Sequence, residues 1–191
     1  LVGFAIGSET LGSIVSPCRR CSVSGLRPTF GRVSRFGCMT LAWSMDKLGP
    51  IARSVEDCAL VFSAIHGADG LDPTAVERPF LWPAKRDLRT FRVGYFEEGP
   101  NSITERELAA LKELGVKLVP IKLPSKYPIG ELTIILNVES AAVFDELTRR
   151  GVSEGIGKWA GPFRQGQFVP AVEYLRANRI RTLLMREMEE A

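Results

Sequence analysis

The sequence contains very little histidine: His66 is the only residue of this type in a chain of 191 residues. A Ser-His-Asp arrangement, in which histidine acts as the base for a serine nucleophile, would therefore depend on His66. This residue falls in the last turn of a helix predicted below. There we expect a capping or surface role rather than catalysis.

The four cysteines do not form a metal-binding pattern. Cys18 and Cys21 have C-x-x-C spacing, but Cys38 and Cys58 do not make a second such pair. Tetrahedral zinc sites usually take paired ligand spacings. We therefore expect no metal, no cofactor, and four reduced thiols in a cytoplasmic protein.

The sequence also lacks an excess of one charge and a long hydrophobic run. With 25 basic and 22 acidic residues, its net charge of +3 is too even to indicate nucleic acid or a membrane surface as partner. No apolar run approaches the ~20 residues that span a bilayer, and the first residues have no signal-peptide pattern. The chain begins at Leu1 without Met, so we expect a fragment of a longer protein.

Alternating strand and helix patterns predict an α/β fold. Caps are expected from Ser54 with Asp57 and from Thr104 with Glu107, each pair three residues apart. Pro170 is expected in the first turn of the last helix. The predicted strands are 1–6 (buried), 91–96 and 116–123, and the predicted helices are 14–21 (short or irregular), 54–67, 104–115, 130–149 and 170–190. In the helix 54–67, the residues at core spacing are Leu60, Val61, Ala64 and Ile65.

The stretch GSETLGS, residues 7–13, is expected to be a tight loop and allows three interpretations. A phosphate-binding loop would need Lys and then Ser or Thr after Gly12, but Ser13 and Ile14 stand there, and Glu9 adds negative charge. A plain turn needs only the Gly, Ser and Thr that are present. An acyl-transfer site would use Ser13 as nucleophile and the loop N–H groups as an oxyanion hole. No lysine has a spacing that marks it as the base.

Three motifs make the sequence resemble the amidase signature family. They are G-S-E-T-x-G-S-I from Gly7, C-x-x-x-G-L-R-P-T-x-G-R-V-S from Cys21, and S-x-D-x-x-G-P-I-x-R-S-V-E-D from Ser44. The segment 171–188 is also similar to the helical region after the signature. The resemblance implies a mixed β-sheet core flanked by helices, of which residues 1–191 are a fragment of a single domain. Its parts would be a signature core (1–67), a surface connection (68–90), and a βαβ and helical part (91–191).

The family uses a Ser–cis-Ser–Lys triad, and the resemblance assigns site residues accordingly. Ser13 would be the nucleophile and Ser8 a hydroxyl that supports the triad. In the family the lysine and the cis-serine belong to segments before the signature, so we expect both to lie outside residues 1–191. The oxyanion hole would consist of the backbone N–H groups of Thr10, Leu11, Gly12 and Ser13.

The resemblance implies an amidase that acts on linear, small-molecule amides through an acyl-enzyme, with the fragment alone inactive. One alternative is the glutaminase subunit of a glutamine-dependent tRNA amidotransferase, which needs partner subunits. Another is a non-catalytic family member that acts as a binding protein, and a nucleotide-binding module is a third.

The sequence departs from the family pattern at three positions. Leu11 and Ser22 stand where the family often has glycine, and Val15 stands where it often has arginine. Leu11 is tolerable if its φ is negative. Asp46 lies within the family pattern, and we expect it to organise the loop.

Overall fold

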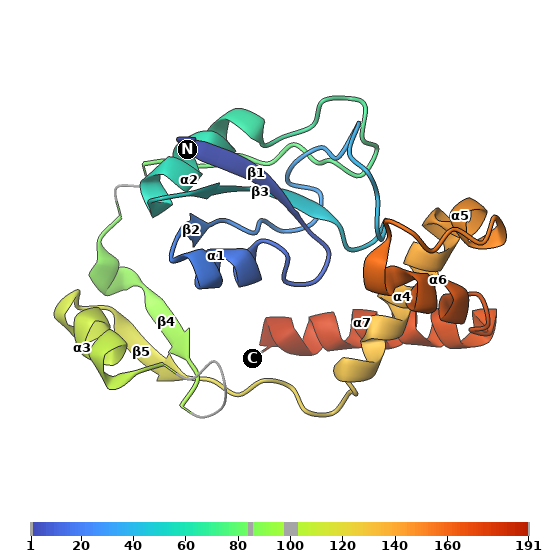
Figure 1. Cartoon of the computed structure of the whole chain (residues 1–191). Coiled ribbons are helices and arrows are strands. Elements are labelled where there is room, and N and C mark those ends of the chain that lie inside the picture. Colours follow the sequence, from blue (N-terminus) through green and yellow to red (C-terminus); the bar gives the residue numbers. More distant parts are fainter. Residues whose placement is uncertain (1, 84–85, 98–102, 191) are drawn as a thin grey trace. The chain divides into compact units, whose positions relative to one another are not determined.

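The computed structural model describes residues 2–83, 86–97 and 103–190, which form two compact units (Figure 1). The first unit contains residues 2–82 and 130–177. The second contains the described residues between 83 and 129 together with 178–190. Residues 84 and 85 of the predicted connection lie outside the described residues.

The first unit combines a small sheet with helices. Its elements up to residue 82 are β1 (Phe4–Glu9), α1 (Val15–Cys21), β2 (Ser24–Gly25), β3 (Lys47–Ala52) and α2 (Val55–Ile65). Its later elements are η2 (Gly130–Leu132), α4 (Thr133–Val143), α5 (Asp145–Arg149), η3 (Gly157–Trp159), α6 (Ala160–Gly166) and the first part of α7 (Ala171–Glu190).

The sheet of the first unit has the order β1-β3-β2, and both pairings are antiparallel. β3 passes very close to its surroundings at Gly49, where a Cβ atom would lie 2.0 Å from the Leu26 carbonyl oxygen, so only glycine fits. The predicted buried strand 1–6 is wrong in two respects. The strand continues to Glu9, because pairing with β3 extends through Lys47. It is also largely exposed, including Phe4 and Ile6.

Helix α2 starts as predicted but buries a different face. The Ser54 hydroxyl accepts a hydrogen bond from the Asp57 amide at 3.0 Å. The expected core face is wrong, since Leu60 is 55% exposed. The buried residues are instead Cys58, Ala59 and Phe62. This face is buried because α2 packs on β3 and because Phe80 meets the Phe62 ring edge-on, with centroids 4.8 Å apart.

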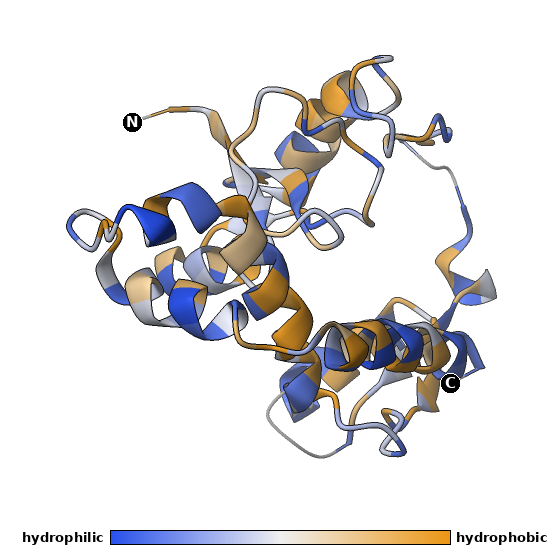
Figure 2. Ribbon diagram, turned by 90° about the vertical axis from the view of Figure 1, so that its right-hand side faces the viewer, coloured by the Kyte–Doolittle hydropathy of each residue, from blue (hydrophilic) through white to orange (hydrophobic). Residues whose placement is uncertain are grey.

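The helical part of the first unit is more divided than the sequence pattern predicts. The predicted helix 130–149 is interrupted at Phe144, whose φ of −103° and ψ of 23° separate α4 from α5. α7 begins as expected, with Pro170 accepting a backbone hydrogen bond from Glu173 at 2.9 Å. Figure 2 shows hydrophilic and hydrophobic residues alternating along α7, which ends at the label C. Among the described helices, none is long and apolar enough to cross a membrane.

The second unit contains the predicted βαβ segment. Strands β4 (Arg92–Tyr95) and β5 (Lys117–Pro120) pair in parallel, with η1 (Leu88–Thr90) before them and α3 (Glu105–Glu113) between them. The predicted capping box is confirmed: Thr104 Oγ1 accepts from the Glu107 amide, and the Thr104 amide donates to the Glu107 carboxylate. Antiparallel and parallel strands with helices packed against them make the chain α/β.

Candidate active site

The turn Thr10–Ser13 joins β1 to α1 and leaves Ser13 exposed. Gly12 has φ of +86°, a left-handed conformation that favours glycine. Among the described residues, the only non-glycine residue with positive φ is Ser22. Leu11 therefore has no positive φ, as its side chain requires. The Gly12 carbonyl accepts from the Ser16 amide at 2.8 Å, which ties the turn to α1.

The buried carboxylate of Glu9 orders the start of α1. It accepts hydrogen bonds from the amides of Ile14 at 2.8 Å and Val15 at 3.0 Å. Burial alone would raise the pKa of Glu9, but these backbone hydrogen bonds outweigh it and lower the pKa. The Gly12 amide also lowers the pKa of Glu9. The Arg27 guanidinium, whose Nε lies 3.5 Å from Glu9 Oε1, lowers it as well. Glu9 thus occupies amides that a phosphate would need, which argues against the phosphate-binding interpretation.

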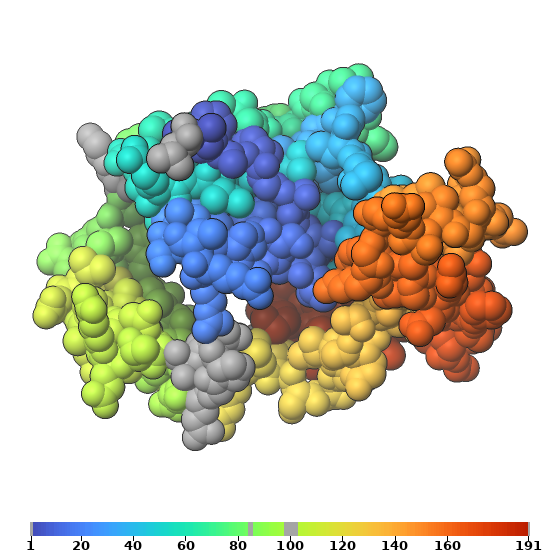
Figure 3. All heavy atoms as spheres, in the orientation of Figure 1, coloured from blue at the N-terminus to red at the C-terminus, as the bar shows by residue number. Residues whose placement is uncertain are grey.

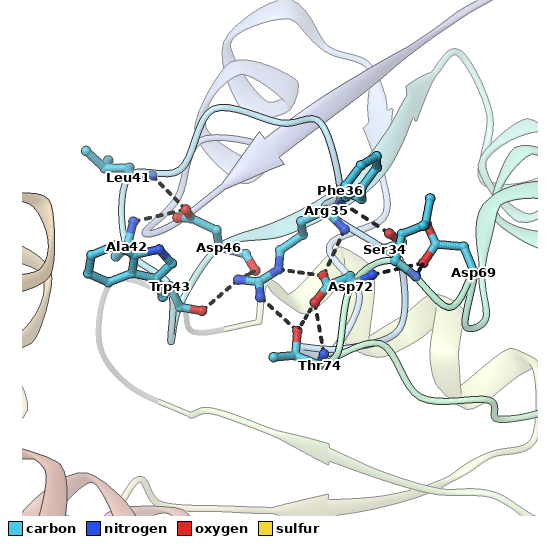
Figure 4. Close-up of polar contacts among 11 residues, drawn as sticks. Ser34, Arg35, Phe36, Leu41, Ala42, Trp43, Asp46, Asp69, Asp72 and Thr74 are labelled. Carbon is cyan, nitrogen blue, oxygen red and sulfur yellow. Dashed lines mark hydrogen bonds and ion pairs between the residues drawn. The ribbon is translucent and has the colours of Figure 1, made fainter. Parts of the chain in front are cut away.

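The loop before β3 fixes Thr10 from the other side. The Thr10 hydroxyl donates to Asp46 Oδ1. Asp46 Oδ2 accepts from the amides of Leu41 at 2.8 Å and Ala42 at 2.9 Å (Figure 4). Asp46 therefore organises the loop, as expected from the sequence. Lys47 Nζ donates to the Thr10 carbonyl at 3.2 Å, and burial lowers the pKa of Lys47.

Arg35 is bound into a network that sequence reasoning missed (Figure 4). Its Nε lies 3.1 Å from Asp72 Oδ2, Nη2 donates to the Thr74 hydroxyl at 2.8 Å, and Nη1 donates to the Trp43 carbonyl at 2.6 Å. Burial alone would raise the pKa of Asp72, but the hydrogen bonds from Thr74 and Arg35 hold it well below its usual range. Asp72 thus anchors part of the predicted surface connection.

A cavity of about 470 Å³ lies beside the Thr10–Ser13 turn. Ser8, Thr10 and Ser13 line it from β1 and the turn. From the helical part it is lined by the aromatic wall, defined here as Phe144, Trp159 and Phe163. Figure 3 shows the light-blue loop before β3 adjoining the orange helical segment.

Glu139 of α4 links the helical part to the loop before β3. This buried carboxylate accepts from the Ser44 amide at 2.9 Å and from the Ser44 hydroxyl at 2.6 Å. It also accepts from the Tyr174 hydroxyl of α7 at 2.9 Å. Glu139 therefore connects α4 and α7 with the loop that carries Asp46.

The structure brings together three of the predicted site residues: Ser8, Thr10 and Ser13 line one cavity. Among the described residues, Leu11 and Gly12 do not line it. The four cysteines are free, and within residues 2–83, 86–97 and 103–190 no group of three or more His, Cys, Asp or Glu side chains could hold a metal ion.

Comparisons with known proteins give a consistent result. A family model described as Amidase matches residues 1–191. A glutamyl-tRNA(Gln) amidotransferase subunit of Moorella thermoacetica is 35% identical, over 98% of this chain and 46% of that protein. The chain spans about half the length of the curated relatives it matches.

Two solved structures are similar in fold as well as in sequence. A glutamyl-tRNA(Gln) amidotransferase subunit from Thermotoga maritima has a TM-score of 0.73 and 28% identity, over 99% of this chain and 44% of that one. The native peptide amidase from Stenotrophomonas maltophilia has a TM-score of 0.69 and 28% identity, over 92% of this chain and 43% of that one. These likenesses confirm the predicted amidase-signature fold.

Proposed function

Because the chain belongs to the Amidase family, we propose that it forms part of an amide-hydrolysing enzyme in which Ser13 is the nucleophile. The observation that carries the proposal is the position of Ser13, which is exposed, follows a positive-φ glycine and lines a cavity. A plain turn without chemistry would not need to be fixed by three charged side chains. Glu9, Asp46 and Lys47 all bond to this turn or to the start of α1.

Ser13 Oγ would form a bond to the amide carbonyl carbon as its proton moves to the base. The C–N bond then breaks, the amine leaves with a proton, and water releases the acid from the acyl-enzyme. The base in this proposal is the family's lysine, acting through the cis-serine. Lys47 is unsuited to that role because its Nζ donates to the carbonyls of Thr10 and Met45.

Backbone N–H groups of the Thr10–Ser13 turn would stabilise the oxyanion, and each good donor of this kind contributes ~3–4 kcal/mol to the transition state. The Gly12 amide also acts on Glu9. We therefore expect Thr10, Leu11 and Ser13 to contribute more than Gly12. The exposed hydroxyl of Ser8 would support the triad from β1.

The test uses the complete natural protein and a fluorophosphonate probe, which reacts with activated serine. We expect the probe to label Ser13, and Ser13→Ala to abolish both labelling and amide hydrolysis. Ser16→Ala is the matched control, because Ser16 is also exposed and lies in the first turn of α1. Persistent turnover in Ser13→Ala would refute the assignment, and an unlabelled natural protein without turnover would favour a non-catalytic binding protein.

A second candidate function is that of the glutaminase subunit of a glutamine-dependent tRNA amidotransferase. It is favoured by the curated relatives, which are amidotransferase subunits. In that case the protein would release ammonia from glutamine, and partner subunits would raise this activity. Measuring glutaminase activity with and without those subunits separates the two functions.

A further inference from the structure

The helical part of the first unit presents a rigid apolar surface to the cavity. In the aromatic wall, the Phe144 and Phe163 rings stack with centroids 4.7 Å apart and an interplanar angle of 19°. The Trp159 and Phe163 rings stack at 5.6 Å and 22°. Phe163 is only 4% exposed, so the wall is fixed by packing behind it. Leu147 and Ile156 extend the apolar lining.

The charged side chains at the cavity are already paired. Among the described lining residues, Arg35 and Asp46 are the charged ones. Each nitrogen of the Arg35 guanidinium donates to Asp72, Thr74 or the Trp43 carbonyl. Both oxygens of Asp46 accept hydrogen bonds from within the protein.

A lining of this kind favours some classes of amide over others. Glutamine carries an α-ammonium and an α-carboxylate, and a charged group that leaves water without a partner is strongly disfavoured. An aromatic ring instead gains both burial and offset stacking against the wall. A cavity of about 470 Å³ is also within the size range of small-molecule sites.

We infer, on the basis of the proposed function, that the aromatic wall binds the acyl group of the substrate and selects aromatic, uncharged acyl groups over glutamine. The wall consists of Phe144, Trp159 and Phe163, and the acyl carbonyl lies toward Ser13. The wall selects these substrates because the aromatic ring of the acyl group is buried against it.

The first test measures binding without catalysis. Calorimetric titration of the complete protein carrying Ser13→Ala compares phenylacetamide, acetamide and glutamine. Phenylacetamide should bind at least about 10-fold more tightly than either of the others, as expected for an added apolar group in a fitted pocket. Equal binding of phenylacetamide and acetamide, tighter binding of glutamine, or no binding of any of the three would overturn the inference.

The second test assigns the selectivity to the wall. Trp159→Leu should reduce the preference for phenylacetamide over acetamide by about 10-fold, mainly through KM. Phe168→Leu is the matched control, because Phe168 is 84% exposed and does not line the cavity. Fluorophosphonate labelling of Ser13 shows that each variant remains folded at the site, and Phe144→Leu replaces Trp159→Leu if that variant is not labelled. An unchanged preference in a labelled wall variant would overturn the inference.

The two tests separate this inference from the proposed function. Selective binding of phenylacetamide to a protein that hydrolyses no amide would support selective binding by the aromatic wall and refute the proposed function. Hydrolysis through Ser13 with no preference for aromatic amides would support the proposed function and refute selection by the aromatic wall.

Discussion

Replacing Glu139 by alanine should be among the more damaging single changes in the first unit. The substitution removes a buried carboxylate that accepts three hydrogen bonds, two from Ser44 and one from Tyr174. A hydrogen bond to a charged group typically contributes ~1.5–3 kcal/mol, but such contributions are not additive, and burying the carboxylate offsets part of them. We therefore expect the free energy of unfolding to fall by about 2–4 kcal/mol.

Removing the Tyr174 hydroxyl shows how much of the loss for Glu139→Ala comes from this one hydrogen bond. Tyr174→Phe removes one donor and should lower the free energy of unfolding by about 1 kcal/mol. Because Glu139 and Tyr174 are in direct contact, the double variant should be less damaged than the sum of the two changes, by about 1 kcal/mol. This coupling would show that the carboxylate, rather than the volume of the side chain, joins α7 to α4.

The measurement is urea denaturation of the complete protein, with unchanged slopes as the condition for comparing free energies. Glu146→Ala is a suitable control, since this residue of α5 is 83% exposed and its ion pair with Arg150 lies at the surface. Such pairs contribute up to about 0.5 kcal/mol in helices. A loss for Glu139→Ala no larger than that of the control, or the absence of coupling to Tyr174, would refute the reasoning.

Two further predictions concern backbone strain and acid stability. Ser22→Gly should raise the free energy of unfolding by about 0.5–1 kcal/mol, because Ser22 has φ of 51° and ψ of 46°, while Ser16→Gly inside α1 should lower it. If urea denaturation shows that both variants change the free energy of unfolding in the same direction, this prediction is wrong. Asp72→Asn should destabilise the protein at neutral pH, and its difference from the natural protein should shrink progressively below about pH 4. The reason is that the lowered pKa of Asp72 contributes fully to stability above the unfolded pKa, and this contribution is lost as the pH falls toward the folded pKa. A difference that stays constant between about pH 7 and pH 3 would show that this linkage is wrong.

Local signals in the sequence predicted local structure. The capping box of Thr104 with Glu107 depends on two residues one helical turn apart, and it is confirmed. The parallel pairing of β4 with β5 follows from the strand-helix-strand order of the segment, and it is confirmed as well. The buried face of α2 was missed because apolar residues occur on more than one side of this helix. Phe80, which lies outside the helix, packs against Phe62 and thereby helps select the buried face.

The candidate site shows the same division between near and distant partners. The sequence placed Ser8, Thr10 and Ser13 together because they belong to one short motif. Glu139 and its partner Ser44 are 95 residues apart, and Asp72 lies 37 residues from Arg35. No local pattern marks such pairs. The signal available in the sequence for Glu139 was a single acidic residue within the largely apolar sequence of α4.

The departures from the family pattern lie in the turn and at the two ends of α1. Leu11 has no positive φ and is 61% exposed, so its side chain is accommodated without strain. Val15 contributes its amide to Glu9 while its side chain is 54% exposed, so the side chain is free to vary. Ser22 is the exception, because its left-handed conformation is one that glycine adopts more readily. The chain thus holds the geometry around Ser13 through Glu9, Asp46 and Lys47 rather than through glycine at every position of the turn.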